Sequence, residues 1–189
     1  MRLMLLKILT CVLRFWLKAK GVRLGKGGWI HGLPETRMTR GSTIEMGDDV
    51  TLISCARFNP LSPARRVSLI TNTPEARIRI GDGVGISSSV ISCFTSITIG
   101  NNTLIGADCL IIDSDFHGLP LGENKPVKSA PVEIGDHVFI GARSIILKGV
   151  KIGNKAIIGA GSVVSADVPE NSVVAGNPAQ IVRSPTSKT

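Results

Sequence analysis

One histidine of this chain lies beside two carboxylates, in the stretch DSDFH that spans residues 113–117. Imidazole has a pKa near neutrality, so His117 is suited to remove a proton from a weak nucleophile such as a hydroxyl group. A carboxylate on the other ring nitrogen would fix the tautomer and stabilise the imidazolium. Asp115 and Asp113 are both candidates for this acid, and the sequence does not choose between them. We therefore predict general base catalysis by a His–Asp pair.

The residues that must position this stretch follow a six-residue period, which is neither the helix period nor strand alternation. Branched aliphatic residues recur at every sixth position, and four of them are followed by glycine. They are Ile134, Ile140, Ile146, Ile152, Ile158 and Val164. The period is typical of a solenoid in which each hexapeptide forms a short strand and a turn. Three hexapeptides make one coil of a triangular prism with an aliphatic interior, and glycine allows backbone angles that a side chain would forbid.

The period is lost over residues 113–131, so His117 is predicted to lie on a segment that leaves the prism. Ile111 and Ile134 are 23 residues apart, five more than three repeats require. Solenoid proteins often carry functional residues on such insertions. An earlier interruption, residues 59–76, contains three prolines and is predicted as a loop or as irregular strands. Phe58, just before this interruption, is predicted to point into the prism and to continue the six-residue repeat.

The run IGDHVFIGARSIILKGVKIGNKAIIGAGSVV, followed by DVPENSVVAGNPAQIVR, resembles the hexapeptide-repeat acyltransferases. The resemblance implies an all-β fold, a left-handed parallel β-helix with hexapeptide repeats. It also implies direct acyl transfer from acetyl-CoA in a homotrimer with active sites at the subunit interfaces. In this family the catalytic histidine lies in the same loop after the same coil, which assigns that role to His117.

The resemblance further implies that acetyl-CoA lies in a groove between two prisms. The corresponding contact positions are Gly141, Ala142, Ala160, Ser165, Ala166 and Arg183. Small residues suit such a groove because the cofactor amides must approach the backbone, and an N–H near Ala142 is placed to polarise the thioester carbonyl. Relatives that act on maltose and galactosides have cations at the positions of Ala166 and Gln180. Arg183, with Lys148 or Lys155, is therefore a candidate partner for the CoA phosphates.

The acceptor implied by the resemblance is a sugar hydroxyl. Maltose and galactoside acetyltransferases place an Asp near the position of Cys93 and Phe94, and that acid is absent here. The chain looks more like the acetyltransferases of surface-polysaccharide pathways (capsule, O-antigen, exopolysaccharide), whose acceptors include lipid-linked sugars. We therefore expect an acetyl-CoA-dependent sugar O-acetyltransferase. The alternatives are an N-acyltransferase on a nucleotide-linked amino sugar and a non-catalytic β-helical scaffold.

A metal site and nucleic-acid binding are not expected. His117 and His137 are twenty residues apart, whereas the zinc site of β-helical carbonic anhydrases needs two histidines five positions apart. His137 falls at a predicted coil corner and is expected to be exposed. The four cysteines contain no CxxC pair. No basic face is interleaved with stacking aromatic residues, which a nucleic-acid site would need.

The net charge of +8 belongs to the N-terminal part of the chain. Residues 1–40 hold nine Lys or Arg and one acid, whereas the other 149 residues hold 13 bases and 13 acids. Residues 1–20 are predicted to form an amphipathic helix, too short and too charged to span a membrane. The helix is predicted either to contact an anionic membrane surface or to pack in the trimer. The expected location is the cytoplasm. If the helix contacts a membrane, the enzyme is expected to be peripheral on the inner face of that membrane.

The predicted organisation has four parts. An N-terminal helix, residues 1–20, is followed by an irregular, glycine-rich connecting segment, residues 21–43. The β-helix domain covers residues 44–183 and includes the loop 113–131, and residues 184–189 form a tail. The narrow aliphatic interior of such a prism has little space for rings, which accounts for the absence of Tyr and the small number of Phe and Trp.

Overall fold

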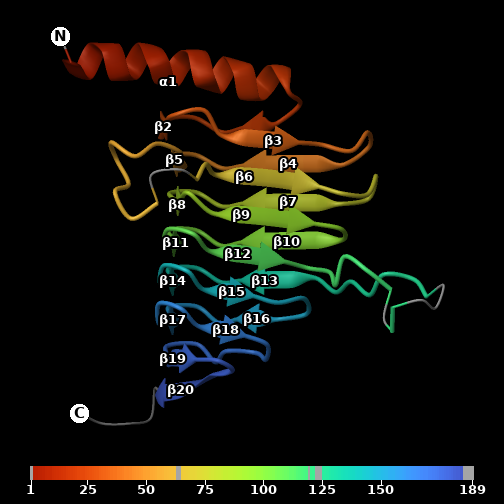
Figure 1. Cartoon of the computed structure of the whole chain (residues 1–189). Coiled ribbons are helices and arrows are strands. Elements are labelled where there is room, and N and C mark those ends of the chain that lie inside the picture. Colours follow the sequence, from red (N-terminus) through yellow and green to blue (C-terminus); the bar gives the residue numbers. More distant parts are fainter. Residues whose placement is uncertain (1, 63–64, 119, 122–124, 185–189) are drawn as a thin grey trace.

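The computed structural model describes residues 2–62, 65–118, 120–121 and 125–184 (Figure 1). Within these ranges one helix, α1 (Arg2–Ala19), is followed by twenty short strands. The predicted tail lies outside the described residues from residue 185 on, and so do a few positions of the loop that carries His117.

The strands form three sheets. Sheet A contains β1 (Arg23–Leu24), β4 (Thr43–Met46), β7 (Arg77–Ile80), β10 (Ser96–Ile99), β13 (Val132–Ile134) and β16 (Lys151–Ile152). Sheet B contains β2 (Trp29–His31), β5 (Thr51–Ile53), β8 (Gly85–Ser87), β11 (Leu104–Ile105), β14 (Phe139–Ile140), β17 (Ile157–Ile158), β19 (Val173–Gly176) and β20 (Ala179–Arg183). Sheet C contains β3 (Glu35–Arg37), β6 (Ser68–Thr71), β9 (Val90–Cys93), β12 (Leu110–Ile112), β15 (Ile145–Ile146) and β18 (Val163–Val164).

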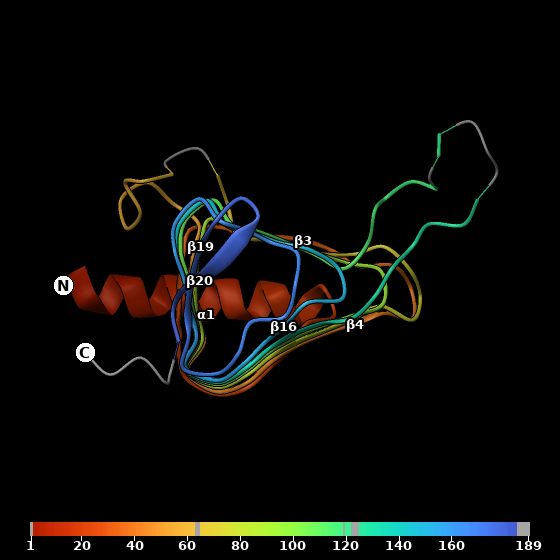
Figure 2. The same ribbon diagram turned by 90° about the horizontal axis from the view of Figure 1, so that it is seen from below.

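Successive strands belong to successive sheets, so the chain winds around a prism and stacks one coil on the next (Figure 1). Neighbouring coils pair in parallel, as β4 does with β7 and β7 with β10. Figure 2 shows the triangular outline from the C-terminal end, where the chain passes from sheet A through B to C clockwise while it advances toward the viewer. The prism is therefore a left-handed parallel β-helix. The antiparallel pair β19 and β20 closes its C-terminal end.

The inward side chains stack in files along the prism axis. In sheet B, Ile105 lies opposite Ile140, and Ile140 lies opposite Ile158. All six residues of the file predicted from position 134 to position 164 are at most 3% exposed. Full burial of one such side chain contributes about 1.5–3 kcal/mol, so these files hold the coils together. The aliphatic interior predicted from the six-residue period is confirmed.

The glycines that follow the inward residues act through close packing rather than through unusual backbone angles. A Cβ at Gly135 would lie 2.4 Å from Oδ1 of Asn154 on the next coil, and Gly135 does not have a positive φ. The left-handed backbone comes two residues later, at His137, which has φ 56° and is exposed. Glycine is thus required because successive coils approach closely at the corners.

The β-helix begins one coil earlier than the sequence pattern indicated. The segment 21–43, which was expected to be irregular, contains β1, β2 and β3, and these pair in parallel with β4, β5 and β6. Leu24, Ile30 and Thr36 continue the six-residue file in this coil. Its several glycines and the polar Thr36 hid the repeat from the pattern.

Two longer segments leave the prism at different corners (Figure 2). Residues 54–67 connect β5 to β6 where sheets B and C meet, and residues 113–131 connect β12 to β13 where sheets C and A meet. We call them the early loop and the histidine loop. In the early loop Phe58 is 38% exposed and not inward as predicted, and Leu69 of β6 takes the inward position.

Helix α1 lies across the N-terminal end of the prism and closes its interior (Figures 1 and 2). Leu13 and Leu17 are buried on its inner face, and the guanidinium of Arg14 donates hydrogen bonds to the carbonyl oxygens of Gly25 and Gly27. The exposed apolar residues of the helix are Leu3, Met4, Leu5, Ile8, Leu9, Val12 and Phe15. No helix in the described part of the chain is long and apolar enough to cross a membrane. Through Leu13, Leu17 and Arg14 the helix packs on the prism, and it leaves a second apolar face uncovered in the single chain.

Candidate active site

His117 lies on the first arm of the histidine loop, close to the point where the two arms are joined. The N–H of Asp115 donates to the carbonyl oxygen of Lys128 at 3.0 Å, and the N–H of Ala130 donates to that of Asp113 at 2.9 Å. The imidazole of His117 is exposed, and among the described residues it has no hydrogen bond or ion pair. The ring is therefore free to meet a ligand or a second chain.

The residue before the histidine fixes the direction of the arm. Phe116 has φ 62°, a left-handed conformation that is unfavourable for a bulky side chain. Its ring packs edge-on against Phe94, with 5.2 Å between the ring centres. This aromatic contact holds the arm against the preceding coil and turns the next residue, His117, outward.

The carboxylate of Asp113 is fully buried and binds the turn between β9 and β10. It accepts hydrogen bonds from the backbone N–H groups of Phe94 (2.7 Å), Thr95 (2.6 Å) and Ser96 (2.9 Å). Burial and the nearby charge of Asp113 raise the pKa of the Cys93 thiol to about 12, so this thiol stays protonated. Hydrogen bonds to an ionised acceptor are among the strong ones. Asp113 therefore anchors the start of the histidine loop to the preceding coil.

Asp115 is held by the following coil. Its Oδ1 lies 2.6 Å from Nζ of Lys148 in the turn after β15, and both side chains are partly buried. The next residue, Gly149, donates its N–H to the carbonyl oxygen of Ala130 at 3.0 Å. One coil thus contacts both arms of the loop. Lys148 is also a predicted partner of the CoA phosphates. The sequence does not indicate its pairing with Asp115, because the two residues are 33 positions apart.

Two predicted cofactor positions line a groove at the corner where sheets B and C meet. The groove has a volume of about 410 Å³. It is lined by Leu61, Ala107, Asp108, Ala142, Arg143, Ala160 and Gly161. The small side chains at Ala142, Ala160 and Gly161 leave the backbone accessible, which suits a ligand with amide groups of its own. We call this the alanine groove.

The other predicted cofactor positions lie outside the lining of this groove: Ser165 and Ala166 are at the corner where sheets C and A meet, and Arg183 pairs with Val173 at the start of β19. Gly141 is buried, and a Cβ there would lie 2.5 Å from the backbone nitrogen of Ala160. Gly141 therefore brings two coils together beneath the groove. Ser165 and Ala166 follow β18 and are exposed, and Arg183 is exposed at the end of β20. These residues lie toward the C-terminal end of the prism.

The early loop forms one wall of the alanine groove, which the sequence did not indicate. Leu61, near the tip of the loop, lines the groove. The hydroxyl of Ser62 donates to Oδ1 of Asp108 at 2.5 Å, and Nε of Arg65 lies 3.3 Å from the same oxygen. The prolines indicate a loop or irregular strands over residues 59–76, of which residues 68–71 form β6, but no local signal shows that Leu61 and Ser62 return to a corner two coils away.

His117 and the alanine groove lie at different corners of one prism. In Figure 2 the histidine loop extends from the corner of sheets C and A, and the early loop marks the corner of sheets B and C. Along the prism axis they are at similar heights, because His117 follows β12 and the groove includes the corner residues just before β12 and β15. A single chain therefore does not bring the histidine to the groove.

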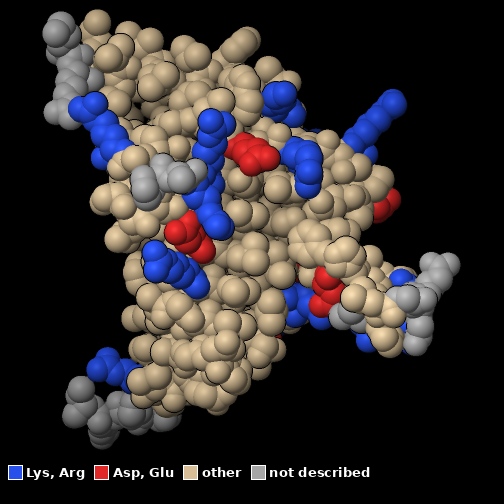
Figure 3. Space-filling model, viewed as in Figure 1, with Lys and Arg blue, Asp and Glu red and all other residues tan. Residues whose placement is uncertain are grey.

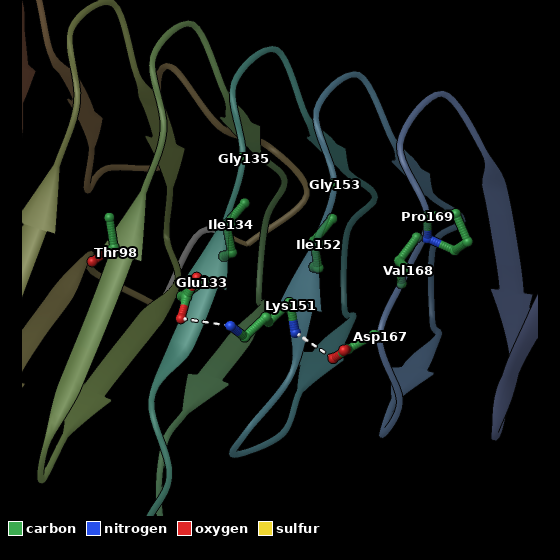
Figure 4. Close-up of a pocket in the computed structure, with 10 residues that line it drawn as sticks. All are labelled: Thr98, Glu133, Ile134, Gly135, Lys151, Ile152, Gly153, Asp167, Val168 and Pro169. Atoms are coloured by element: carbon green, nitrogen blue, oxygen red, sulfur yellow. Dashed lines mark hydrogen bonds and ion pairs between the residues drawn. The ribbon is translucent and has the colours of Figure 1, made fainter.

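A larger hollow, of about 530 Å³, lies on the outer face of sheet A and contains none of the predicted site residues (Figure 4). Its polar groups pair with one another. Nζ of Lys151 lies 3.2 Å from Oε1 of Glu133, and the backbone N–H of Lys151 donates to Asp167 at 2.8 Å. Across the described residues, no group of three or more His, Cys, Asp or Glu side chains is placed to hold a metal ion. The predicted site residues lie instead on the histidine loop, in and beneath the alanine groove, and toward the C-terminal end of the prism.

Comparison with known proteins identifies the family. The family model "Hexapeptide repeat of succinyl-transferase" matches residues 96–125 and 131–166. Galactoside O-acetyltransferase of Escherichia coli is 30% identical over 175 residues, which cover 81% of each chain. This chain belongs to the hexapeptide-repeat acyltransferases. The predicted family and the predicted left-handed β-helix are thereby confirmed.

Two further relatives bear on the chemistry of this acyltransferase. WbbJ of E. coli, assigned by name to lipopolysaccharide biosynthesis as an O-acetyl transferase, is 35% identical over 117 residues, 56% of this chain and 60% of WbbJ. The crystal structure of a hexapeptide-repeat acetyltransferase from Vibrio cholerae in complex with acetyl-CoA superposes with a TM-score of 0.57 and 34% identity, over 63% of this chain and 66% of the other. A Mycobacterium tuberculosis relative is matched over only 49% of its length. The predicted enzyme class and co-substrate agree with these relatives.

Proposed function

We propose that this protein transfers an acetyl group from acetyl-CoA to a sugar hydroxyl, with His117 as the general base. One observation carries the proposal: an exposed histidine on an anchored loop and a groove of small residues lie at the same height of the prism. The names of two relatives specify O-acetyl transfer, to a galactoside in one case. A solved relative binds acetyl-CoA.

In the proposed reaction the imidazole of His117 takes the proton of the acceptor hydroxyl while the oxygen attacks the thioester carbonyl carbon. A backbone N–H at the alanine groove stabilises the negative charge that develops on the carbonyl oxygen. The carbon–sulfur bond then breaks, and the imidazolium returns the proton to the leaving thiolate of CoA. The products are an O-acetyl ester and free CoA.

Asp115 is the better candidate for the acid that orients His117. The carboxylate of Asp113 is fully buried and accepts hydrogen bonds from three backbone N–H groups, and a rotation toward His117 would break all three. Asp115 is only partly buried and is held by one flexible lysine, Lys148. Lys148 contacts Oδ1 of Asp115, and we propose that Oδ2 accepts the hydrogen bond from the imidazole of His117.

We propose a homotrimer because the site is incomplete in one chain. In a closed cyclic assembly about an axis parallel to the prism, equivalent coils of all protomers lie at the same height. The histidine loop of one protomer then lies level with the alanine groove of its partner. Light scattering at micromolar concentration tests this arrangement, and a monomeric mass would contradict it.

The acceptor that we favour is a glycan of a surface-polysaccharide pathway (capsule, O-antigen or exopolysaccharide), in its lipid-linked form. Support comes from the name of WbbJ and from the N-terminal part of the chain. Residues 1–40 carry the net charge of +8, and α1 exposes an apolar face next to it. We therefore place the enzyme in the cytoplasm, in contact with the inner face of the membrane through residues 1–20.

The test is an acceptor screen with isotopically labelled acetyl-CoA. Simple galactosides, oligosaccharides of surface polysaccharides and nucleotide-linked amino sugars are incubated with the enzyme, and products are detected by mass. We expect an alkali-labile acetyl ester on a glycan. An alkali-stable product formed only on an amino sugar would replace this proposal by N-acylation. The absence of any acetylated product would remove the proposed function.

A further inference from the structure

A pocket of about 370 Å³ lies between the first half of α1 and the early loop, and neither the histidine loop nor the alanine groove includes it. Its apolar surface comes from Leu5, Leu6, Leu9, Cys55 and Phe58. The volume is in the range of sites that bind small ligands, roughly 300–1,000 Å³. Such a lining offers few hydrogen bonds and therefore favours a hydrocarbon ligand.

The one ionisable ring in the pocket lining, His31, adds to this apolar character. Its ring stacks against Phe58 with 4.0 Å between ring centres and lies nearly parallel to the ring of Trp29, at 6.0 Å. Burial lowers the pKa of His31, so the ring is neutral at neutral pH. The aromatic stack closes the pocket toward the prism without adding a charge.

The charged residue in the pocket lining is a cation, Arg57. It is exposed at the edge of the pocket and forms no ion pair within the part of the chain that the structure describes. Figure 3 shows that the end of the molecule formed by α1 has almost no charged side chains in this view, whereas the flank below it carries Lys and Arg together with a smaller number of Asp and Glu. The apolar face of α1 continues from the pocket through Ile8 and Val12, which are both more than half exposed.

We propose that this pocket binds one hydrocarbon chain of an anionic membrane phospholipid, with the lipid phosphate on Arg57. A hydrocarbon chain matches the lining, an anion matches the cation Arg57, and a flat apolar helix at the end of the molecule matches the plane of a bilayer. This inference deepens the proposed membrane contact, because it names a lipid site that the helix alone does not provide.

A second copy of the chain is a poorer occupant of the same surface. End-to-end docking through α1 would bring two segments of net charge +8 against each other. Like charges across an interface oppose association. An anionic lipid surface has the opposite sign and gains from every nearby Lys and Arg.

The first experiment titrates the trimer or monomer, as isolated, with dodecyl phosphate below its micelle concentration. This probe carries one chain and one phosphate. We expect saturable binding at one site per chain, measured by calorimetry. In Cys55→Trp the new side chain fills the pocket, and each methylene kept out of an apolar site weakens binding about fourfold. A loss of at least about tenfold is therefore expected.

Two variants separate charge and position. Arg57→Glu should weaken dodecyl phosphate severalfold because the phosphate loses its cation. Cys11→Trp is the matched control: Cys11 is an exposed cysteine of α1 that lines a different hollow, beside Arg14. Its affinity for the probe should equal that of the wild type. Thermal unfolding of each variant confirms that the fold is retained.

The second experiment measures sedimentation with vesicles of phosphatidylglycerol and phosphatidylcholine, or of phosphatidylcholine alone. Binding should require the anionic lipid and should fall in Cys55→Trp and Arg57→Glu but not in Cys11→Trp. Absence of saturable dodecyl phosphate binding, or equal effects of the two tryptophan variants, would overturn the proposal. A mass that doubles on concentration and falls in Cys55→Trp would assign the pocket to a second copy and overturn it as well. These readouts do not use acetyl transfer, so failure of the proposed reaction would leave them interpretable.

Discussion

The two loops that leave the prism are attached to it by different kinds of contacts. The histidine loop is fixed by ionised groups with low exposure, through the buried carboxylate of Asp113 and the pair of Asp115 with Lys148. The early loop is fixed to Asp108 by a hydroxyl and by Arg65, whose side chain is 56% exposed. A general base must be held within hydrogen-bond distance of its proton, whereas an apolar wall tolerates small shifts. The fully buried carboxylate of Asp113 is thus the strongest of these anchors, and it holds the loop that carries the candidate base.

The largest expected effect tests whether the histidine loop performs the chemistry. His117→Ala should lower turnover by roughly 10²–10⁴-fold, the usual contribution of general base catalysis. Acetyl-CoA affinity should change little, because the proposed contacts lie at the alanine groove. His137→Ala is the matched control, since His137 is an exposed corner residue on the same prism. Turnover and acetyl-CoA affinity are measured for both, and equal, small losses would end the assignment of His117.

The anchors of the two loops should differ in their effect on stability. Asp113→Asn places an NH₂ group or a weaker acceptor in a fully buried position against three N–H donors, and a hydrogen bond to a charged group contributes about 1.5–3 kcal/mol. Asp108→Asn removes contacts that are partly exposed, for which about 0–1 kcal/mol is expected. Urea unfolding measures both free energies. A loss for Asp108→Asn as large as that for Asp113→Asn would contradict the difference between the two anchors.

The prism itself was predictable because a six-residue file of aliphatic residues has few structural solutions. The repeat from residue 134 to residue 164 places every inward side chain correctly, and the loss of the period marks the segment that carries His117. The first coil escaped prediction because Thr36 replaces an aliphatic residue and glycines replace polar corner residues. A repeat is detected through its side chains, so a coil with few apolar side chains is hard to see.

The contacts that complete the candidate site were not predictable in the same way. Asp113 and Asp115 are two residues apart and equivalent in the sequence, yet one binds the preceding coil and the other the following coil. The wall at Leu61 depends on a loop that folds back across two coils to Asp108. A periodic pattern specifies the regular coils, and it carries no information about where an irregular segment returns to them.

The pair of Lys148 with Asp115 should have a moderate effect on the histidine loop. Lys148→Met removes an ion pair that is partly exposed, for which a contribution of up to about 1 kcal/mol is expected. Turnover should fall by up to about fivefold with little change in the KM for acetyl-CoA. Lys151→Met is the control, because its pair with Glu133 is more exposed and lies on the face of sheet A. If Lys148 binds CoA phosphate instead, Lys148→Met should mainly raise the KM for acetyl-CoA.

The smallest expected effect concerns the early loop and the length of the acyl group. In the proposed trimer the reacting carbonyl lies level with His117, which is the height of Ala107 and Leu61 rather than that of Arg183. Leu61 then limits the space for the acyl chain. One methylene in an apolar pocket changes the discrimination between two substrates by about 1–3 kcal/mol when the pocket is buried. Leu61 is 67% exposed, so we expect an effect at the low end of this range. Leu61→Ala should raise kcat/KM for butyryl-CoA relative to acetyl-CoA by about threefold to tenfold, while Leu33→Ala, at another partly exposed leucine, should leave the ratio unchanged. An unchanged ratio in Leu61→Ala would place the acyl group elsewhere and would make the early loop a wall for the pantetheine part alone.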